Sequence, residues 1–112
     1  QAIDYIYVHI MDRITVNELA GAIGISPTHL SRIFKQETGI SVSEYIRQRK
    51  IDMAKNLLRF SNYDFVEIAV MLSYSSQSHF IQHFRAQVGM TPKAYRKQNY
   101  LNNWNVNREG AT

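Results

Sequence analysis

The sequence contains an internal repeat with an offset of about fifty residues, and this repeat limits the possible folds more than any other feature. Three pairs of identical residues define the offset: Phe34 and Phe84, Gly39 and Gly89, and Tyr45 and Tyr95. Upstream of these pairs the offset is shorter by one, so the second copy has an extra residue between Tyr74 and Ser76. Self-similarity of this kind indicates one structural unit used twice. Each copy has the length of two short helices joined by a tight turn.

Composition excludes several classes of protein. The chain has 112 residues, 45% of them hydrophobic and 20% charged, which is typical of one globular domain. It has no Cys, so a disulfide framework, a Cys-ligated zinc and a thiol nucleophile are excluded. No apolar run approaches the roughly 18 residues of a membrane span, and we expect no membrane partner. The net charge of +4 favours polyanionic partners.

Caps, glycines and prolines divide the chain into seven predicted helices. A capping box, in which an N-cap oxygen accepts a backbone N–H while Glu reaches back to the cap, is predicted at Thr15 to Glu18 and again at Ser41 to Glu44. The predicted helices are Ala2 to Asp12, Thr15 to Gly24, Ser26 to Gly39, Val42 to Arg59, a short helix capped by Asp64, Ser76 to about Val88, and Pro92 to about Gln98. The apolar stripe of the first comprises Ile3, Ile6, Tyr7 and Ile10.

The fold class predicted is therefore all-α, with seven helices, no strand, and two helix-turn-helix subdomains joined by a long connector helix. A generic helical bundle would explain the periodicity but not the repeat. We interpret residues 1–112 as one domain, with a first subdomain over about 1–41, a connector over about 42–59, a second subdomain over about 60–99 and a frayed tail over 100–112.

Each predicted helix pair has the parts of a helix-turn-helix. Ala20 and Ala69 supply the small residue where the helices cross. The turns are Gly24-Ile25-Ser26 and Ser73-Tyr74-Ser75-Ser76, with Ile25 and Tyr74 as the apolar residue beneath each turn. Phe34 and Phe84 belong to the inner faces of the second helices, and we expect Tyr45 and Tyr95 to pack under them.

The outward faces of the second helices carry side chains that reach base edges and phosphates. At 100° per residue the first face comprises Thr28, Arg32 and Lys35, flanked by Ser31 and Gln36. The second comprises Ser78, Gln82 and Arg85, flanked by Gln77 and Ile81. Such residues also occur on ordinary solvated faces, but two matched helices with suitable turns favour DNA binding.

The sequence offers little for catalysis, and we expect no enzyme activity, no cofactor and no metal. It has no HExxH motif, no Gly-rich phosphate loop and no nucleophile–base pair. His29 and His79 occupy one repeat position on separate units, so we interpret them as flanking residues that hydrogen-bond a phosphate or a neighbour. His83 replaces Ile33 of the first copy and is predicted to be a half-buried packing residue.

These residues resemble the AraC/XylS family of bacterial transcription regulators over about Ile14 to Tyr100. The resemblance is carried by Leu19-Ala20, Gly24-Ile25-Ser26, His29-Leu30-Ser31-Arg32-Ile33-Phe34-Lys35, Gly39, Tyr45-Ile46, Arg49-Lys50-Ile51, Ala54, Leu57-Leu58, Ile68-Ala69, Tyr74-Ser75, Phe80, Phe84-Arg85, Gly89-Met90-Thr91-Pro92 and Tyr95-Arg96. It implies two helix-turn-helix subdomains joined by a rigid helix, Val42 to Arg59. Each would insert its second helix into one of two successive major grooves of double-stranded DNA, covering roughly 20 bp.

The resemblance also implies roles for individual residues. The base-reading positions are Thr28, Ser31, Arg32, Gln77, Ser78, Ile81 and Gln82. The phosphate-contacting positions are Ser26, Lys35, Arg49, Ser76 and Arg85. Two residues depart from the family pattern: Ser73 stands where Gly is common, at a cost of about 1 kcal/mol if φ is positive, and Ile81 is apolar at a reading position. We therefore expect the first copy to carry more of the affinity.

The function expected is a sequence-specific DNA-binding regulator that positions RNA polymerase, usually as an activator, in the bacterial cytoplasm. The alternative is an interaction module in which one helix-turn-helix binds DNA and the other contacts RNA polymerase or a partner domain. Because the first residue is Gln, we expect the chain to be the C-terminal module of a longer regulator with an N-terminal sensor domain. A stand-alone short member of the family is the alternative.

Overall fold

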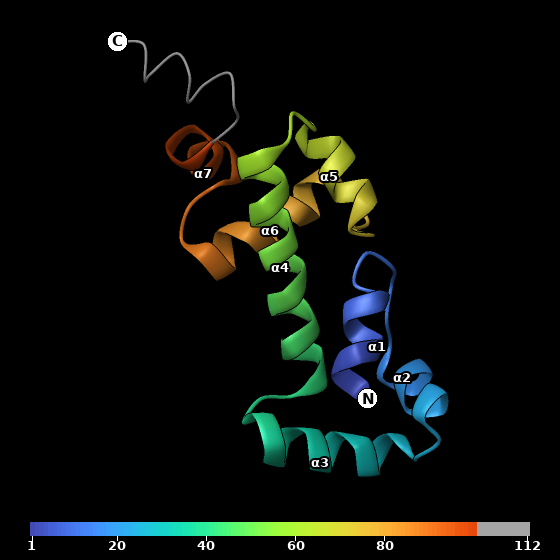
Figure 1. Ribbon diagram of the computed structural model, residues 1–112. Helices are drawn as coiled ribbons and strands as arrows, with labels where there is room; N and C mark the ends of the chain where they lie inside the picture. The colour runs from blue at the N-terminus through green and yellow to red at the C-terminus, as the bar shows by residue number, and fades with distance from the viewer. Residues whose placement is uncertain (101–112) are drawn as a thin grey trace. The chain divides into compact units, whose positions relative to one another are not determined.

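The computed structural model describes residues 1–100, which form seven α-helices and no strand (Figure 1). The helices are α1 (Ala2–Val8), α2 (Val16–Ile23), α3 (Pro27–Thr38), α4 (Val42–Phe60), α5 (Phe65–Met71), α6 (Gln77–Val88) and α7 (Pro92–Asn99). The all-α class and the order of helices predicted from the sequence are confirmed. The tail predicted to be frayed lies, beyond Tyr100, outside the described residues.

The chain divides into two compact units, Gln1–Lys50 and Ile51–Thr112, and the dividing point lies inside α4. In the first unit, α2 packs against both α1 and α3. In the second unit, α6 packs against α5 and α7. The buried apolar side chains of the first unit are Ile6, Ile10, Leu19, Ala20, Leu30, Phe34, Val42 and Ile46. Those of the second are Ile51, Ala54, Leu58, Ile68, Ala69, Leu72, Phe80 and Phe84.

Both units close their turns with the same backbone hydrogen bonds. The N–H of Ile25 donates to the carbonyl of Ala20 at 3.1 Å, and that of Tyr74 donates to Ala69 at 2.9 Å. The residue before each donor bonds the following carbonyl of the helix, at 3.3 Å from Gly24 and 3.1 Å from Ser73. This pair of bonds is the Schellman motif, which requires a left-handed residue at its second-to-last position.

An aromatic pair occurs at the same repeat position in both units, between the second helix of the helix-turn-helix and the helix that follows it. Phe34 meets Tyr45 at a centroid distance of 5.3 Å and an interplanar angle of 76°. Phe84 meets Tyr95 at 5.5 Å and 72°. Edge-to-face contacts of this kind add to the energy of burial. The predicted packing of both tyrosines is confirmed, and it joins each second helix to the helix that follows it.

Arg96 joins α7 to the end of α4 within the second unit. Its guanidinium donates to the backbone carbonyls of Leu57, Leu58 and Ser61 at 3.3, 3.0 and 3.2 Å. The last carbonyls of a helix have no partner within the helix and carry partial negative charge, so a cation stabilises them. Arg96 lies in the segment that resembles the family, but the sequence did not indicate this role.

Three local predictions differ from the structure. The first helix ends at Val8 rather than Asp12, because the chain turns where Asp12 N–H donates to the His9 carbonyl at 2.8 Å. Two members of the apolar stripe predicted for this helix, Ile3 and Tyr7, are 46% and 80% exposed, whereas Ile6 and Ile10 are buried. At the first predicted capping box, the Thr15 hydroxyl accepts from the backbone N–H of Glu18, as expected. The Glu18 carboxylate, however, accepts from the Thr15 hydroxyl at 2.9 Å, whereas a capping box pairs it with the backbone N–H of the cap residue.

The turns of the two units differ in the residue that adopts the left-handed conformation. It is Gly24 in the first unit, with φ 79°, and Ser73 in the second, with φ 61°. Ser73 is the only residue with positive φ other than glycine among residues 1–100. Ser73, which departs from the family pattern, therefore occupies a left-handed position at which a side chain is disfavoured.

Ser73→Gly should raise the free energy of unfolding by about 0.5–1 kcal/mol. Glycine relieves about 1–2 kcal/mol of left-handed strain, partly offset by its greater entropy in the unfolded chain. Urea unfolding followed by circular dichroism measures the difference. The matched control is Gly24→Ala, which should lose about 1 kcal/mol from backbone strain alone, because no atom lies within 4 Å of an added Cβ. An unchanged or lower stability of Ser73→Gly would contradict the expectation.

Candidate nucleic-acid interface

Helix α3 presents a continuous polar face on the surface of the first unit. Ser26 is its N-cap and accepts a hydrogen bond from the backbone N–H of His29 at 3.1 Å, and Pro27 opens the first turn. Burial of Leu30 and Phe34 against the unit fixes the rotation of the helix. The residues predicted on the outward face line one open surface depression: Thr28, Ser31, Arg32, Lys35 and Gln36. The structure thus brings the predicted reading residues of this unit together.

Helix α6 presents the corresponding face of the second unit. Ser76 caps it by accepting from the backbone N–H of His79 at 3.0 Å, and Phe80 and Phe84 are fully buried. Exposed positions predicted to contact DNA follow on the outer side: Gln77, Ser78, Gln82 and Arg85. Ile81, the apolar residue at a predicted base-reading position, is only partly exposed. Base-reading and phosphate roles remain predictions for both helices.

The two faces predicted to read bases differ in charge. The exposed cations on α3 are Arg32 and Lys35, whereas α6 carries Arg85 alone. Neither helix has an acidic residue in its first turn. The first face therefore has the greater attraction for phosphates, in line with the inequality expected from the sequence.

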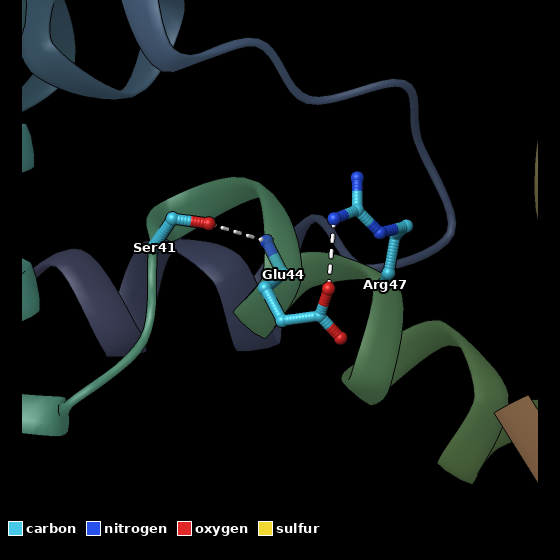
Figure 2. Close-up of polar contacts among 3 residues, drawn as sticks. All are labelled: Ser41, Glu44 and Arg47. Atoms are coloured by element: carbon cyan, nitrogen blue, oxygen red, sulfur yellow. Dashed lines mark hydrogen bonds and ion pairs between the residues drawn. The ribbon is translucent and has the colours of Figure 1, made fainter.

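Cations of α4 in the first unit are engaged by neighbouring side chains. Arg47 donates to the Glu44 carboxylate at 2.8 Å, and Glu44 itself donates its backbone N–H to Ser41 at 3.1 Å (Figure 2). Arg49, predicted to contact phosphate, has its guanidinium 4.9 Å from the centroid of the Tyr45 ring. Burial and the nearby Arg13 lower the pKa of Lys50, partly opposed by Asp12. The Arg49 contact with phosphate stays a prediction.

An aromatic cluster joins the turn of the second unit to α6. The Tyr74 hydroxyl lies 2.6 Å from Nδ1 of His83, and its ring packs against Phe80 at a centroid distance of 5.4 Å. His83 is half-buried, as predicted. In the first unit the same repeat positions are Ile25 and Ile33. The sequence did not lead us to predict the hydrogen bond between Tyr74 and His83. The replacement of Ile25 and Ile33 by a phenol and an imidazole at the same two repeat positions could have indicated it.

Each unit therefore contains a helix-turn-helix: a buried alanine, a Schellman turn, and a capped second helix with an exposed polar face. A chain with two such units is a helix-turn-helix domain of the DNA-binding class. Residues 19–98 match the protein family described as "Helix-turn-helix domain". The chain belongs to this family, and its relatives identify it as an AraC-type DNA-binding domain of a transcription regulator. The resemblance found in the sequence is confirmed.

Individual relatives extend the match over most of the chain. The transcriptional activator AarP of Providencia stuartii is 32% identical over 88 residues, which cover 79% of this chain and 65% of AarP. The C-terminal domain of AraT, a response regulator from Geobacillus stearothermophilus, is 30% identical with a TM-score of 0.87 and covers 92% of this chain and 86% of that one. The DNA-binding domain of the global transcriptional factor AdpA, solved with a target DNA, is 27% identical with a TM-score of 0.81 and covers 87% of each chain.

The chain spans less than two thirds of the length of the first curated relatives that it matches. The match to the family extends across both helix-turn-helix units, which does not favour the alternative that only one unit binds DNA. Within residues 1–100 no helix has the length and apolarity to cross a membrane. The same residues hold no group of three His, Asp or Glu side chains that could bind a metal ion.

The phenol of Tyr74 should ionise far later than an exposed tyrosine. Burial raises the pKa of Tyr74 from 10.0 to about 12, because the phenolate would lose its hydration. The stabilisation from this group is therefore complete below pH 10 and falls as the pH rises to about 12, since only the unfolded state ionises in that range.

Unfolding free energies of the wild type and Tyr74→Phe, measured across the alkaline range, test this. The advantage of the wild type over the variant should decline above pH 10. Tyr7→Phe is the matched control, because that side chain is 80% exposed. A difference between wild type and Tyr74→Phe that stayed constant to about pH 12 would contradict the expectation.

Proposed function

We propose that the chain reads DNA sequence with α3 and α6, inserted into two successive major grooves. The observation that carries this proposal is the repetition, in both units, of a Schellman turn followed by a Ser-capped helix with an exposed polar face. Side chains of the two faces would select bases, with Arg32 suited to guanine and Gln77 or Gln82 to adenine. Lys35 and Arg85 would contact phosphates, together with the backbone amides at Ser26 and Ser76.

We propose further that the chain acts by binding and not by catalysis, as the DNA-binding module of a longer cytoplasmic regulator. The lengths of its relatives support a larger protein, in which a sensor domain would precede the module. Bound beside a promoter, the module would position RNA polymerase, usually to activate transcription. Support for this comes from AarP, which is described as a transcriptional activator.

Groove-specific footprinting tests the proposal. A duplex is selected from a random pool by the 112-residue chain, and guanine N7 methylation then reports contacts in the major groove. Protection of two stretches one helical turn apart, about 10 bp, is expected. Protection of one stretch only would support the module in which the other unit contacts a protein. Equal affinity for selected and scrambled duplexes would overturn sequence-specific binding altogether.

Arg32→Ala should relax sequence preference at one base pair and cost about 1–3 kcal/mol of binding free energy on the selected duplex. The guanidinium is exposed in the depression on α3 and is the side chain there best suited to bidentate contact with a base. Titration of duplexes substituted at each position measures the loss. A uniform loss across all duplexes would contradict a base-reading role.

Lys35→Ala should weaken binding to all sequences alike, because a lysine on the same face contacts phosphate as a point charge. The slope of log K against log salt should fall by about 0.9, the contribution of one neutralised phosphate. Lys93→Ala, an exposed cation at the start of α7, is the matched control for a change in net charge. Equal effects of the two variants would show that Lys35 acts only through net charge.

A further inference from the structure

The Arg32 side chain is held by a histidine of its own helix. One terminal nitrogen of the guanidinium, Nη2, lies 2.9 Å from Nδ1 of His29. The two residues are three apart, so they share one face of α3. A guanidinium has donors only, so Nδ1 of His29 must accept and the ring proton must lie on Nε2. The contact uses one of the five N–H groups of Arg32 and leaves others for a base.

The second unit has a histidine, His79, at the same repeat position, but its side chain contacts other residues. Nδ1 of His79 lies 3.1 Å from the Ser75 hydroxyl, and its ring meets Tyr74 at a centroid distance of 5.2 Å. Ser75 belongs to the turn that is longer by one residue than its counterpart in the first unit. Gln82 corresponds to Arg32, and within residues 1–100 the structure shows no hydrogen bond between Gln82 and His79. The histidines at this repeat position therefore have different partners, Arg32 in the first unit and Ser75 with Tyr74 in the second.

We propose that His29 is a positioning residue for base recognition by Arg32, an inference that rests on the function proposed above. A long arginine loses much rotamer freedom when it binds, and a side chain ordered beforehand loses less. A neutral imidazole orders the guanidinium without cancelling its charge, which a carboxylate at this position would do. His29 thus orders the side chain with which the first unit would contact a base, while His79 hydrogen-bonds the turn of the second unit.

Binding of the 112-residue chain to its selected duplex and to a scrambled duplex tests the proposal. His29→Ala should lower the preference for the selected duplex by about two- to tenfold, the range expected when one ordered side chain is released. Affinity for the scrambled duplex should not change. His29→Gln keeps an acceptor at this position and should restore most of the preference. His79→Ala, the matched control, should leave discrimination at the base pair read by Arg32 unchanged.

A double-mutant cycle separates positioning from other effects. In the Arg32→Ala background, His29→Ala should have no further effect on preference, because the side chain that it orders is gone. An equal loss in both backgrounds would overturn the proposal. A wild-type chain that fails to discriminate between the two duplexes would instead overturn the proposed function.

A measurement without DNA tests the contact between His29 and Arg32 independently of the proposed function. The ring ¹⁵N spectrum of the free chain in mildly alkaline buffer should show His29 as the Nε2–H tautomer, with Nδ1 accepting a hydrogen bond. The signal of Nδ1 should shift in Arg32→Ala. A His29 ring protonated on Nδ1, or a spectrum unaffected by Arg32→Ala, would overturn the contact itself.

Discussion

The hydrogen-bonded turn between the paired helices determines the geometry of each unit. Its left-handed residue, Gly24 or Ser73, allows the next N–H to reach back to the carbonyl of a buried alanine. That bond closes the first helix and sends the chain away from it. The second helix begins within a few residues at a serine cap, so the turn decides where its exposed face starts. Packing of Phe34 or Phe84 then fixes the rotation of that face.

The two copies keep this backbone and differ in what supports it. In the first unit the residues beneath the turn and on the facing helix are Ile25 and Ile33, which need no partner. In the second they are Tyr74 and His83, which bond each other at 2.6 Å. This bond offsets part of the hydration that a half-buried phenol and imidazole lose on folding. The second copy therefore has a polar contact beside the turn in which Ser73 adopts the left-handed conformation, where the first copy has only apolar packing.

The repeat, the caps and the glycines predicted most of the fold. Local rules sufficed for these elements, since the N-cap serines and the left-handed glycines act through the nearest backbone. Side-chain partners were less predictable. Glu18 bonds the Thr15 hydroxyl, and Arg96 bonds carbonyls more than thirty residues away. Such choices depend on rotamers and on tertiary packing, which a linear pattern does not contain. The exposed positions of the candidate interface could be predicted because burial of Leu30 and Phe80 leaves one face outward.

The distribution of acidic residues distinguishes α3, α6 and α7 from α2, α4 and α5. Helices α2, α4 and α5 each have a glutamate in the first turn, Glu18, Glu44 or Glu67, which complements the positive end of the helix dipole. Helices α3 and α6 have none, and neutral Ser26 and Ser76 cap them. The same is true of α7, which begins at Thr91 and Pro92. A helix start without its own carboxylate keeps its attraction for external anions. A glutamate in the first turn of α3 or α6 would stabilise the free helix and would oppose the phosphate contacts proposed above, so the absence of an acid there is consistent with the proposed function but is shared by α7.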